Sequence, residues 1–140
     1  MNELAPPRVV VIEDDPDTVA FLEHLLTDLG LQLIACPPTL ALACLETARP
    51  QLVVLDVRLG TQDGIALFHQ LRAQISTSAL PVIFFTANAA KVRSRLPRYA
   101  ALGAALVSKP NITELIAPLQ AIFPHAGAEA AAGDARSGPA

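Results

Sequence analysis

Short apolar runs alternate with longer amphipathic stretches along most of the chain. Five of these runs are rich in aliphatic residues and are bounded by proline, glycine or charged residues, as buried strands usually are. They cover residues 9–12, 31–35, 52–56, 82–85 and 104–108. The run from Leu52 to Leu55 is apolar without interruption, which predicts a strand covered on both faces of a parallel sheet.

The stretches between these runs have helical spacing and recognisable ends. Asp15 is a good N-cap, Pro16 suits a first turn, and Gly30 is a typical residue after a helix end. Thr39 is expected to cap a second helix that runs to about Arg49. A third helix is expected from residue 65 to about residue 74.

Two prolines fall inside the fourth and fifth expected helices. A proline in a helix interior costs about 3 kcal/mol, because it removes a hydrogen bond and its ring clashes with the preceding turn. Pro97 therefore predicts that the fourth helix is kinked or begins late, near Leu96. Pro118 predicts a short or bent fifth helix, which Asn111 is placed to cap.

Five strands that alternate with five helices predict an α/β fold with a doubly wound parallel sheet. The strand order we expect is the flavodoxin-like 2-1-3-4-5, with a domain over residues 8–123, a lead-in at 1–7 and a disordered tail at 124–140. In this order the crevice lies between the first and third strands. Glu13, Asp14 and Asp56 follow those strands, so the three carboxylates should converge there.

Composition and charge limit the classes of function that the chain can have. The chain has 140 residues and a net charge of −3, which argues against a general nucleic-acid binder, and no apolar run is long enough to span a bilayer. Cys36 and Cys44 show no metal-binding spacing and fit two reduced core cysteines in a cytoplasmic protein. The cluster of Lys91, Arg93, Arg95 and Arg98 is either a solvated helix face or a partner-binding surface.

Three carboxylates in one crevice repel each other, and a hard divalent cation such as Mg²⁺ relieves that repulsion. The fourth and fifth strands end at Thr86 and Lys109, which add a hydroxyl group and an ammonium group. Such groups stabilise the oxygens of a phosphoryl group. Asp56 can then act as a nucleophile that forms an acyl phosphate.

Four stretches, VVVIEDDPD, LVVLDVRLGTQDG, PVIFFTA and LVSKP, resemble the signature regions of response-regulator receiver domains. The resemblance covers about residues 8–122. It implies that Asp56 is the phosphoacceptor and that Glu13, Asp14, Asp56 and the backbone carbonyl of Arg58 bind magnesium. It also implies that Thr86 and Lys109 bind the phosphoryl group, and that the donor is a histidine kinase or a histidine phosphotransfer protein.

The chain departs from the family pattern after Thr86. The position that often holds a switching aromatic residue is Leu106, so an aromatic rotamer switch is not expected there. Arg58 and Asn88 flank the phosphorylation site, and we expect Arg58 to shield the acyl phosphate partly from water. In receivers the fourth helix, fifth strand and fifth helix form the usual output face, which here contacts an unknown downstream protein.

Three functions fit these residues. The first is a stand-alone receiver, not an enzyme in the ordinary sense, that signals by binding a partner or by draining phosphate from one. The second is a phosphorylation-independent scaffold, which the complete set of site residues argues against. The third is an aspartyl phosphatase, which usually carries a second acid where this chain has Arg58.

Overall fold

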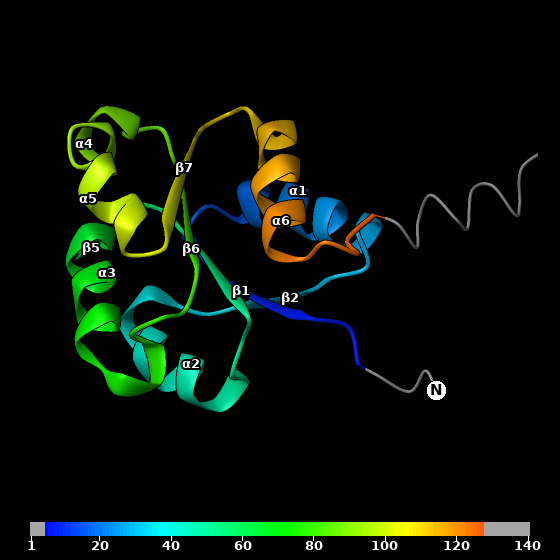
Figure 1. The fold of residues 1–140 in the computed structure, drawn as a ribbon, viewed down its shortest axis with the longest axis horizontal. Coiled ribbons are helices and arrows are strands. Elements are labelled where there is room, and N and C mark those ends of the chain that lie inside the picture. Colours follow the sequence, from blue (N-terminus) through cyan, green and yellow to red (C-terminus); the bar gives the residue numbers. More distant parts are fainter. Residues whose placement is uncertain (1–4, 128–140) are drawn as a thin grey trace, which may run out of the picture.

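The structure is a computed structural model, and residues 5–127 are described below. Its centre is a five-stranded parallel sheet (Figure 1), with the strands in the order β2-β1-β3-β6-β7. The strands are β1 (Arg8–Ile12), β2 (Gln32–Ala35), β3 (Leu52–Leu55), β6 (Val82–Thr86) and β7 (Ala104–Ser108). The five strands and the predicted 2-1-3-4-5 order are confirmed.

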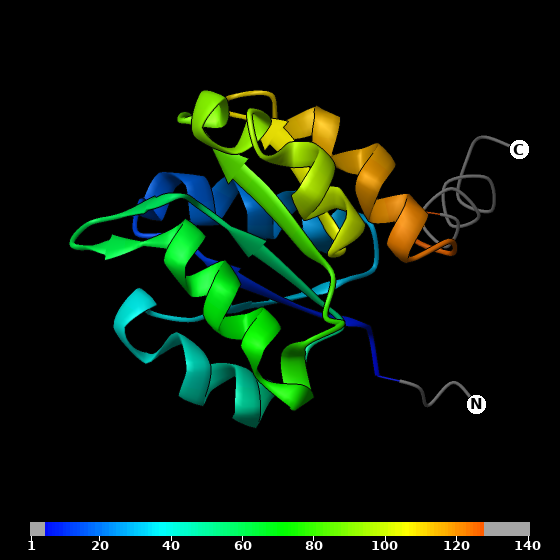
Figure 2. The same ribbon diagram turned by 60° about the vertical axis from the view of Figure 1, so that its left-hand side comes forward.

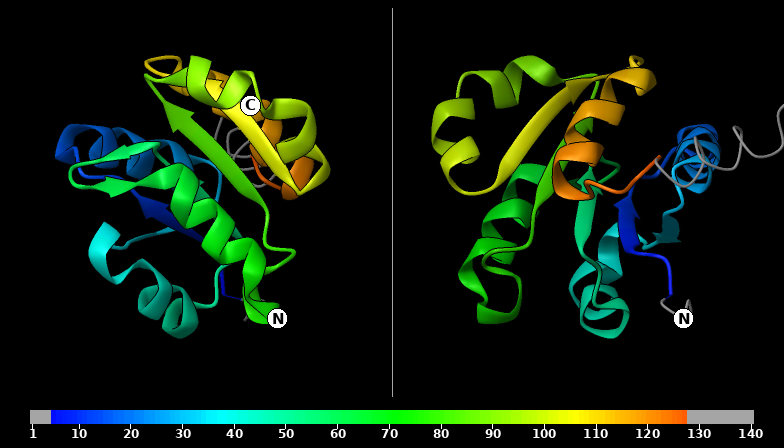
Figure 3. Two further views of the ribbon diagram at one scale, coloured as in Figure 1. Left: turned by 90° about the vertical axis from the view of Figure 1, so that its left-hand side faces the viewer. Right: turned by 45° about the vertical axis from the view of Figure 1, so that its right-hand side comes forward.

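Helices cover both faces of the sheet. Figure 3 shows α1 (Pro16–Asp28) and α6 (Ile116–Ile122) on one side. The other face is covered by α2 (Ala41–Ala48), α3 (Gly64–Ala73), α4 (Ala89–Arg93) and α5 (Leu96–Ala101). Alternate residues of each strand enter the two apolar cores, and the residues of β3 are at most 3 % exposed. The uninterrupted apolar run of β3 is thus explained by burial on both faces.

The first helix begins and ends where its sequence predicts. The Asp15 side chain caps α1 by accepting a hydrogen bond from the Asp17 backbone N–H, and Pro16 occupies the first position. Gly30 follows the helix with a φ of 77°. A residue with a Cβ is strained at such an angle, so glycine suits this turn.

The two later prolines shape the helices as expected. The fourth helical segment is divided into α4 and α5, and Pro97 lies in the first turn of α5. The fifth segment begins as a 3₁₀ turn, η3 (Ile112–Leu115), and continues as the seven-residue α6, with Pro118 in its first turn. In a first turn the missing proline N–H removes no helix hydrogen bond. Because of the division at Pro97, the described part of the chain has six α-helices where five were expected.

Three local features differ from the sequence predictions or were missed by them. Thr39 caps no helix: it lies inside the 3₁₀ turn η1 (Pro38–Leu40), and α2 begins only at Ala41. Asn111 stands before η3 but its side chain makes no capping hydrogen bond. A small antiparallel hairpin, β4 (Arg58–Leu59) with β5 (Gln62–Asp63), follows β3 and projects from the domain (Figure 2).

The prediction of two reduced cysteines is wrong in this structure. Cys36, at the end of β2, and Cys44, on α2, form a disulfide with their Cα atoms 6.0 Å apart. Their separation of eight residues carries no pairing signal, and the fold alone brings the end of β2 against α2. Cys36 is buried in the core, as expected.

The ordered domain extends past residue 123. Residues 124–127, which the composition assigned to a tail, turn back against the domain: Ala126 is buried, and the Gly127 N–H donates to the Leu29 carbonyl. The remainder of the expected tail, 128–140, lies outside the described residues. Within the described part of the chain, no helix is long and apolar enough to cross a bilayer.

Candidate functional site

The carboxyl ends of β1 and β3 bring three carboxylates together. Glu13 and Asp14 follow β1, Asp56 follows β3, and the Asp56 N–H donates to the Ile12 carbonyl at 3.2 Å. One carboxylate oxygen from each of the three acids lies within 4.8 Å of the other two. The convergence expected from the strand order is therefore present.

Lys109 links two of these acids. It follows β7, and its Nζ lies 2.7 Å from Glu13 Oε1 and 2.9 Å from Asp56 Oδ2. The side chains of Glu13, Asp56 and Lys109 are only 3, 8 and 18 % exposed. The peptide bond between Lys109 and Pro110 is cis. Lys109 is thus a largely buried cation that bridges the ends of β1 and β3.

The charges in the crevice perturb one another. Burial raises the pKa of Glu13 above its ordinary value, although hydrogen bonds from Lys109 and from the Asp15 N–H oppose the change. Burial alone lowers the pKa of Lys109, but its hydrogen bonds to Glu13 and Asp56 and their negative charges outweigh burial, and the pKa is raised. Lys109 therefore carries its positive charge at neutral pH.

Thr86 contributes a hydroxyl group at the end of β6. The residue is fully buried, and its Oγ1 accepts a hydrogen bond of 3.0 Å from the Asn88 backbone N–H. The Thr86 carbonyl accepts from the Lys109 N–H at 2.9 Å, which fixes the end of β6 against the residue after β7. Because Oγ1 is the acceptor in the contact with Asn88, its own proton is free to be donated elsewhere.

Two glycines allow the chain to fold closely around Asp56. Gly64 opens α3 and its N–H donates to the Val57 carbonyl at 2.7 Å, so a Cβ at this position would overlap the Asp56 carbonyl oxygen. Gly60 turns the β4–β5 hairpin with a φ of 65°, where a Cβ would lie 3.7 Å from Asp14 Oδ2. Neither residue was predicted to constrain the site, although the LGTQDG stretch after Asp56 contains both.

The donor set suits a magnesium ion. Three ionised carboxylates and one ammonium group have a net charge of −2, which a divalent cation would neutralise. All three side chains offer oxygen, the ligand that magnesium prefers, and Asp14 is exposed so that water can complete the coordination. Glu13, Asp14 and Asp56 therefore fit the ion.

The remaining predicted residues lie around this crevice. The Arg58 N–H makes a long hydrogen bond of 3.4 Å to Asp56 Oδ1, while the Arg58 side chain is exposed. Asn88 lies at the start of α4. Leu106 pairs with Phe84 in the sheet and packs against the apolar core beneath α3–α5.

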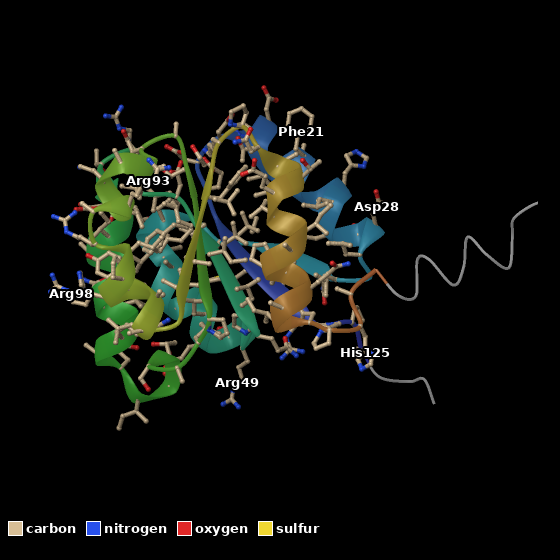
Figure 4. The ribbon with its side chains drawn as sticks, turned by 45° about the horizontal axis from the view of Figure 1, so that its top comes forward. Phe21, Asp28, Arg49, Arg93, Arg98 and His125 are labelled. Carbon is tan, nitrogen blue, oxygen red and sulfur yellow. A yellow bond between two sulfur atoms is a disulfide. The ribbon has the colours of Figure 1, made fainter. Side chains whose placement is uncertain are left out.

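A groove opens beside Lys109, between α1 and the segment after β7. Its lining includes Phe21, Phe85, Pro110 and Ile112, together with Asp15, Asp17 and Thr18 near the start of α1. Phe21 is 63 % exposed and projects at the top of Figure 4. An apolar surface thus lies next to the ion pairs of the crevice.

The fold and the crevice define a flavodoxin-like domain with an acidic cluster, one that fits a metal ion, at its topological switch point. The family model of the response regulator receiver domain matches residues 9–120. The chain therefore belongs to the response regulator receiver domain family, whose members act in two-component systems.

Similar proteins agree with this assignment. The chain is 37 % identical over 90 residues to an uncharacterised 14.6 kDa protein of Leptolyngbya boryana, a match that covers 64 % of this chain and 69 % of that protein. It is 32 % identical over 124 residues to the probable transcriptional regulatory protein TcrX of Mycobacterium tuberculosis, covering 87 % of this chain. The match covers 52 % of TcrX, so the chain spans about half the length of that relative.

A solved structure with a metal ion is also similar. The receiver domain of the sensor histidine kinase PA1611 of Pseudomonas aeruginosa is 26 % identical to this chain, with a TM-score of 0.72 over 86 % of this chain and 99 % of that one. That structure holds a magnesium ion in its active-site cleft. The acidic cluster described above is compatible with the same ion.

Proposed function

We propose that the chain is a phosphoacceptor receiver in which Asp56 takes a phosphoryl group from a phosphohistidine. One observation carries this proposal: the largely buried Lys109 bridges Glu13 and Asp56, and one carboxylate oxygen of each of Glu13, Asp14 and Asp56 lies within 4.8 Å of the other two. An ammonium group and a cluster of carboxylates at three strand ends are poorly explained by stability, since removing charges from water is costly. They suit a site that receives a charged group.

In the proposed step, a carboxylate oxygen of Asp56 attacks the phosphorus atom. A P–O bond forms, the P–N bond to the donor imidazole breaks, and its electron pair stays on the imidazole nitrogen, which takes a proton. The Thr86 hydroxyl donates a hydrogen bond to one phosphoryl oxygen, and the Lys109 ammonium group pairs with another. Hydrolysis of the acyl phosphate by water later restores the Asp56 carboxylate.

Glu13, Asp14, Asp56 and the backbone carbonyl of Arg58 would hold the magnesium ion. When bound, the ion neutralises negative charge on the transferred group and on the acids around it. Lys109 then exchanges its contact with Asp56 for one with the phosphoryl group, while its contact with Glu13 can persist. The exposed Arg58 side chain, two residues after Asp56, would partly shield the acyl phosphate from water.

The donor is a histidine kinase or a histidine phosphotransfer protein. The groove of Phe21, Phe85, Pro110 and Ile112 lies next to Lys109 and offers the donor an apolar contact at the site. Output would then pass through the face made by α4–α5, β7 and α6. At Leu106 that face has no aromatic residue to report the state of Thr86, so the readout depends on other residues of the face.

Intact mass spectrometry tests the proposal. The protein is incubated with magnesium and a small phosphodonor such as acetyl phosphate, in parallel with Asp56→Asn. We expect one phosphoryl adduct on the native chain and none on the variant, with EDTA preventing the adduct. An unmodified native chain would indicate a scaffold, and continuous turnover of the donor that Asp56→Asn abolishes would indicate an aspartyl phosphatase.

A further inference from the structure

The charge of the chain is divided sharply along the sequence. Residues 64–113 contain no aspartate or glutamate, yet they hold six of the ten lysines and arginines of the whole chain. This segment forms α3, β6, α4, α5 and β7. One side of the domain is therefore cationic despite the net charge of −3.

Two of the six cations serve the fold and the site. The Arg72 guanidinium donates to the carbonyls of Leu102, Thr77 and Leu80 at 2.6–3.0 Å, and it lies 4.8 Å from the centre of the Phe68 ring. Lys109 forms salt bridges with Glu13 and Asp56 in the acidic crevice. The other four lie on or between α4 and α5.

These four form a basic surface, which we define as Lys91, Arg93, Arg95 and Arg98. All four are exposed, and Figure 4 shows Arg93 and Arg98 projecting outward from the α4–α5 side of the domain. Within residues 5–127, Lys109 is the only cation that forms salt bridges, so none of these four residues is paired with an acid there. Arg95 also donates a side-chain hydrogen bond of 2.9 Å to the Lys91 carbonyl.

The basic surface does not suit a symmetric dimer of this chain. The four residues of the basic surface supply no negative charge, so a two-fold interface centred on them would place cations opposite cations. The exposed acids Asp17, Glu23 and Asp28 lie instead on α1, which Figure 4 shows on the other side of the domain from α4–α5. An occupant of the basic surface must bring negative charge of its own.

The surroundings of the basic surface favour a protein over a nucleic acid. Tyr99, the aromatic residue of α5, is 2 % exposed and cannot stack on a base. Leu102 is 42 % exposed and lies four residues after Arg98, so an apolar contact adjoins a cation at the end of α5. Arginines beside an apolar contact are typical of protein interfaces.

We propose that the basic surface binds an acidic segment of a partner protein, one that also carries apolar residues. This inference rests on the proposed function only in assigning output to the face that contains α4 and α5. The binding itself needs neither Asp56 nor its phosphorylation, because the four charges are exposed in the unmodified chain.

The test is a fluorescence anisotropy titration of the full chain against a labelled peptide of about 15 residues, in which glutamates and leucines alternate at helical spacing. Arg93→Gln/Arg98→Gln should weaken binding about three- to tenfold at low salt. Arg49→Asn removes one exposed arginine from the end of α2, where asparagine tolerates the observed φ of 46°, and should leave the affinity unchanged. Asp56→Asn should bind as the native chain does, which separates this inference from the proposed function.

Three results would overturn the inference. One is equal affinity of the native chain and Arg93→Gln/Arg98→Gln for the peptide. Another is tighter binding of a DNA duplex of matched charge through the same arginines. The third is self-association that disappears in the double variant, since the occupant would then be α1 of a second copy. Unchanged thermal unfolding of the variants controls for misfolding.

Discussion

Replacement of Lys109 with methionine tests the electrostatics of the crevice. Methionine keeps an unbranched apolar stem but removes the ammonium group that lies 2.7 Å from Glu13 and 2.9 Å from Asp56. The two carboxylates would then face each other and Asp14 without a cation. Their side chains are 3 and 8 % exposed, so water can compensate little for the loss.

The expected magnitude follows from the burial of the three groups. Removing one partner of a fully buried ion pair typically costs about 3–5 kcal/mol. Because 18 % of the Lys109 side chain is exposed and Asp14 opens the crevice to solvent, we expect a smaller loss, about 2–3 kcal/mol. A typical domain is stable by only about 5–15 kcal/mol, so the loss is readily measurable.

Urea unfolding in EDTA at pH 7.5 measures this loss. The matched control is Lys91→Met, because Lys91 is an exposed lysine that forms no salt bridge within residues 5–127. Magnesium should stabilise Lys109→Met more than the native chain, since the acids of the variant lack the ammonium group. A loss below about 0.5 kcal/mol, which is typical of surface substitutions, would refute the reasoning.

The same comparison has a definite pH dependence in metal-free protein. The raised pKa of Lys109 means that its stabilisation is present below the ordinary value of 10.5 and is lost as the pH rises through the folded-state pKa. The raised pKa of Glu13 means that the cost of ionising it appears as the pH rises above its ordinary value of 4.5. The part of the Lys109→Met deficit that comes from the lost contact with Glu13 should therefore be smaller near pH 4 than at pH 7.5.

Three further substitutions test separate parts of the account. Arg58→Ala should shorten the lifetime of the acyl phosphate, measured as the decay of the phosphorylated mass after donor removal, because a shield against water is lost; an unchanged decay would contradict it. Gly64→Ala should lower the free energy of unfolding in urea by about 1–3 kcal/mol and slow phosphorylation, because the added Cβ overlaps the Asp56 carbonyl. The control is Ala73→Gly at the exposed end of α3, which should cost at most about 1 kcal/mol and leave phosphorylation unchanged. Arg72→Met should cost about 2–3 kcal/mol, because three backbone carbonyls lose their charged donor, while the exposed Arg98→Met should change stability by less than about 0.5 kcal/mol.

The sheet and the acidic cluster could be predicted because both follow from local patterns and a topological rule. Each strand is an apolar run with clear ends, and parallel strands place their carboxyl ends at one edge. Glu13 and Asp56 are 43 positions apart in sequence, yet both come directly after strands that prove to be neighbours. The division of the fourth helical segment near Pro97 and the short α6 around Pro118 were predictable for a similar reason, since proline acts through the backbone of its own turn.

Contacts made across the fold were not predictable in this way. The ion pair between Lys109 and Glu13 depends on side-chain reach between β7 and β1, which the strand order alone does not give. Gly64 is constrained by the backbone of Asp56, a contact that no spacing rule reports. Cys36 and Cys44 were assigned as reduced because composition indicates a compartment and not a distance.

The central claim is that Asp56, and none of its acidic neighbours, carries the phosphoryl group. Borohydride reduces an acyl phosphate to an alcohol, so reduction of the phosphorylated chain followed by peptide mapping identifies the modified residue. We predict homoserine at position 56 in protein treated with magnesium and a phosphodonor, and aspartate there in the EDTA control. Reduction at Glu13 or Asp14, or no reduced residue in a chain that carries the phosphoryl mass, would contradict the account.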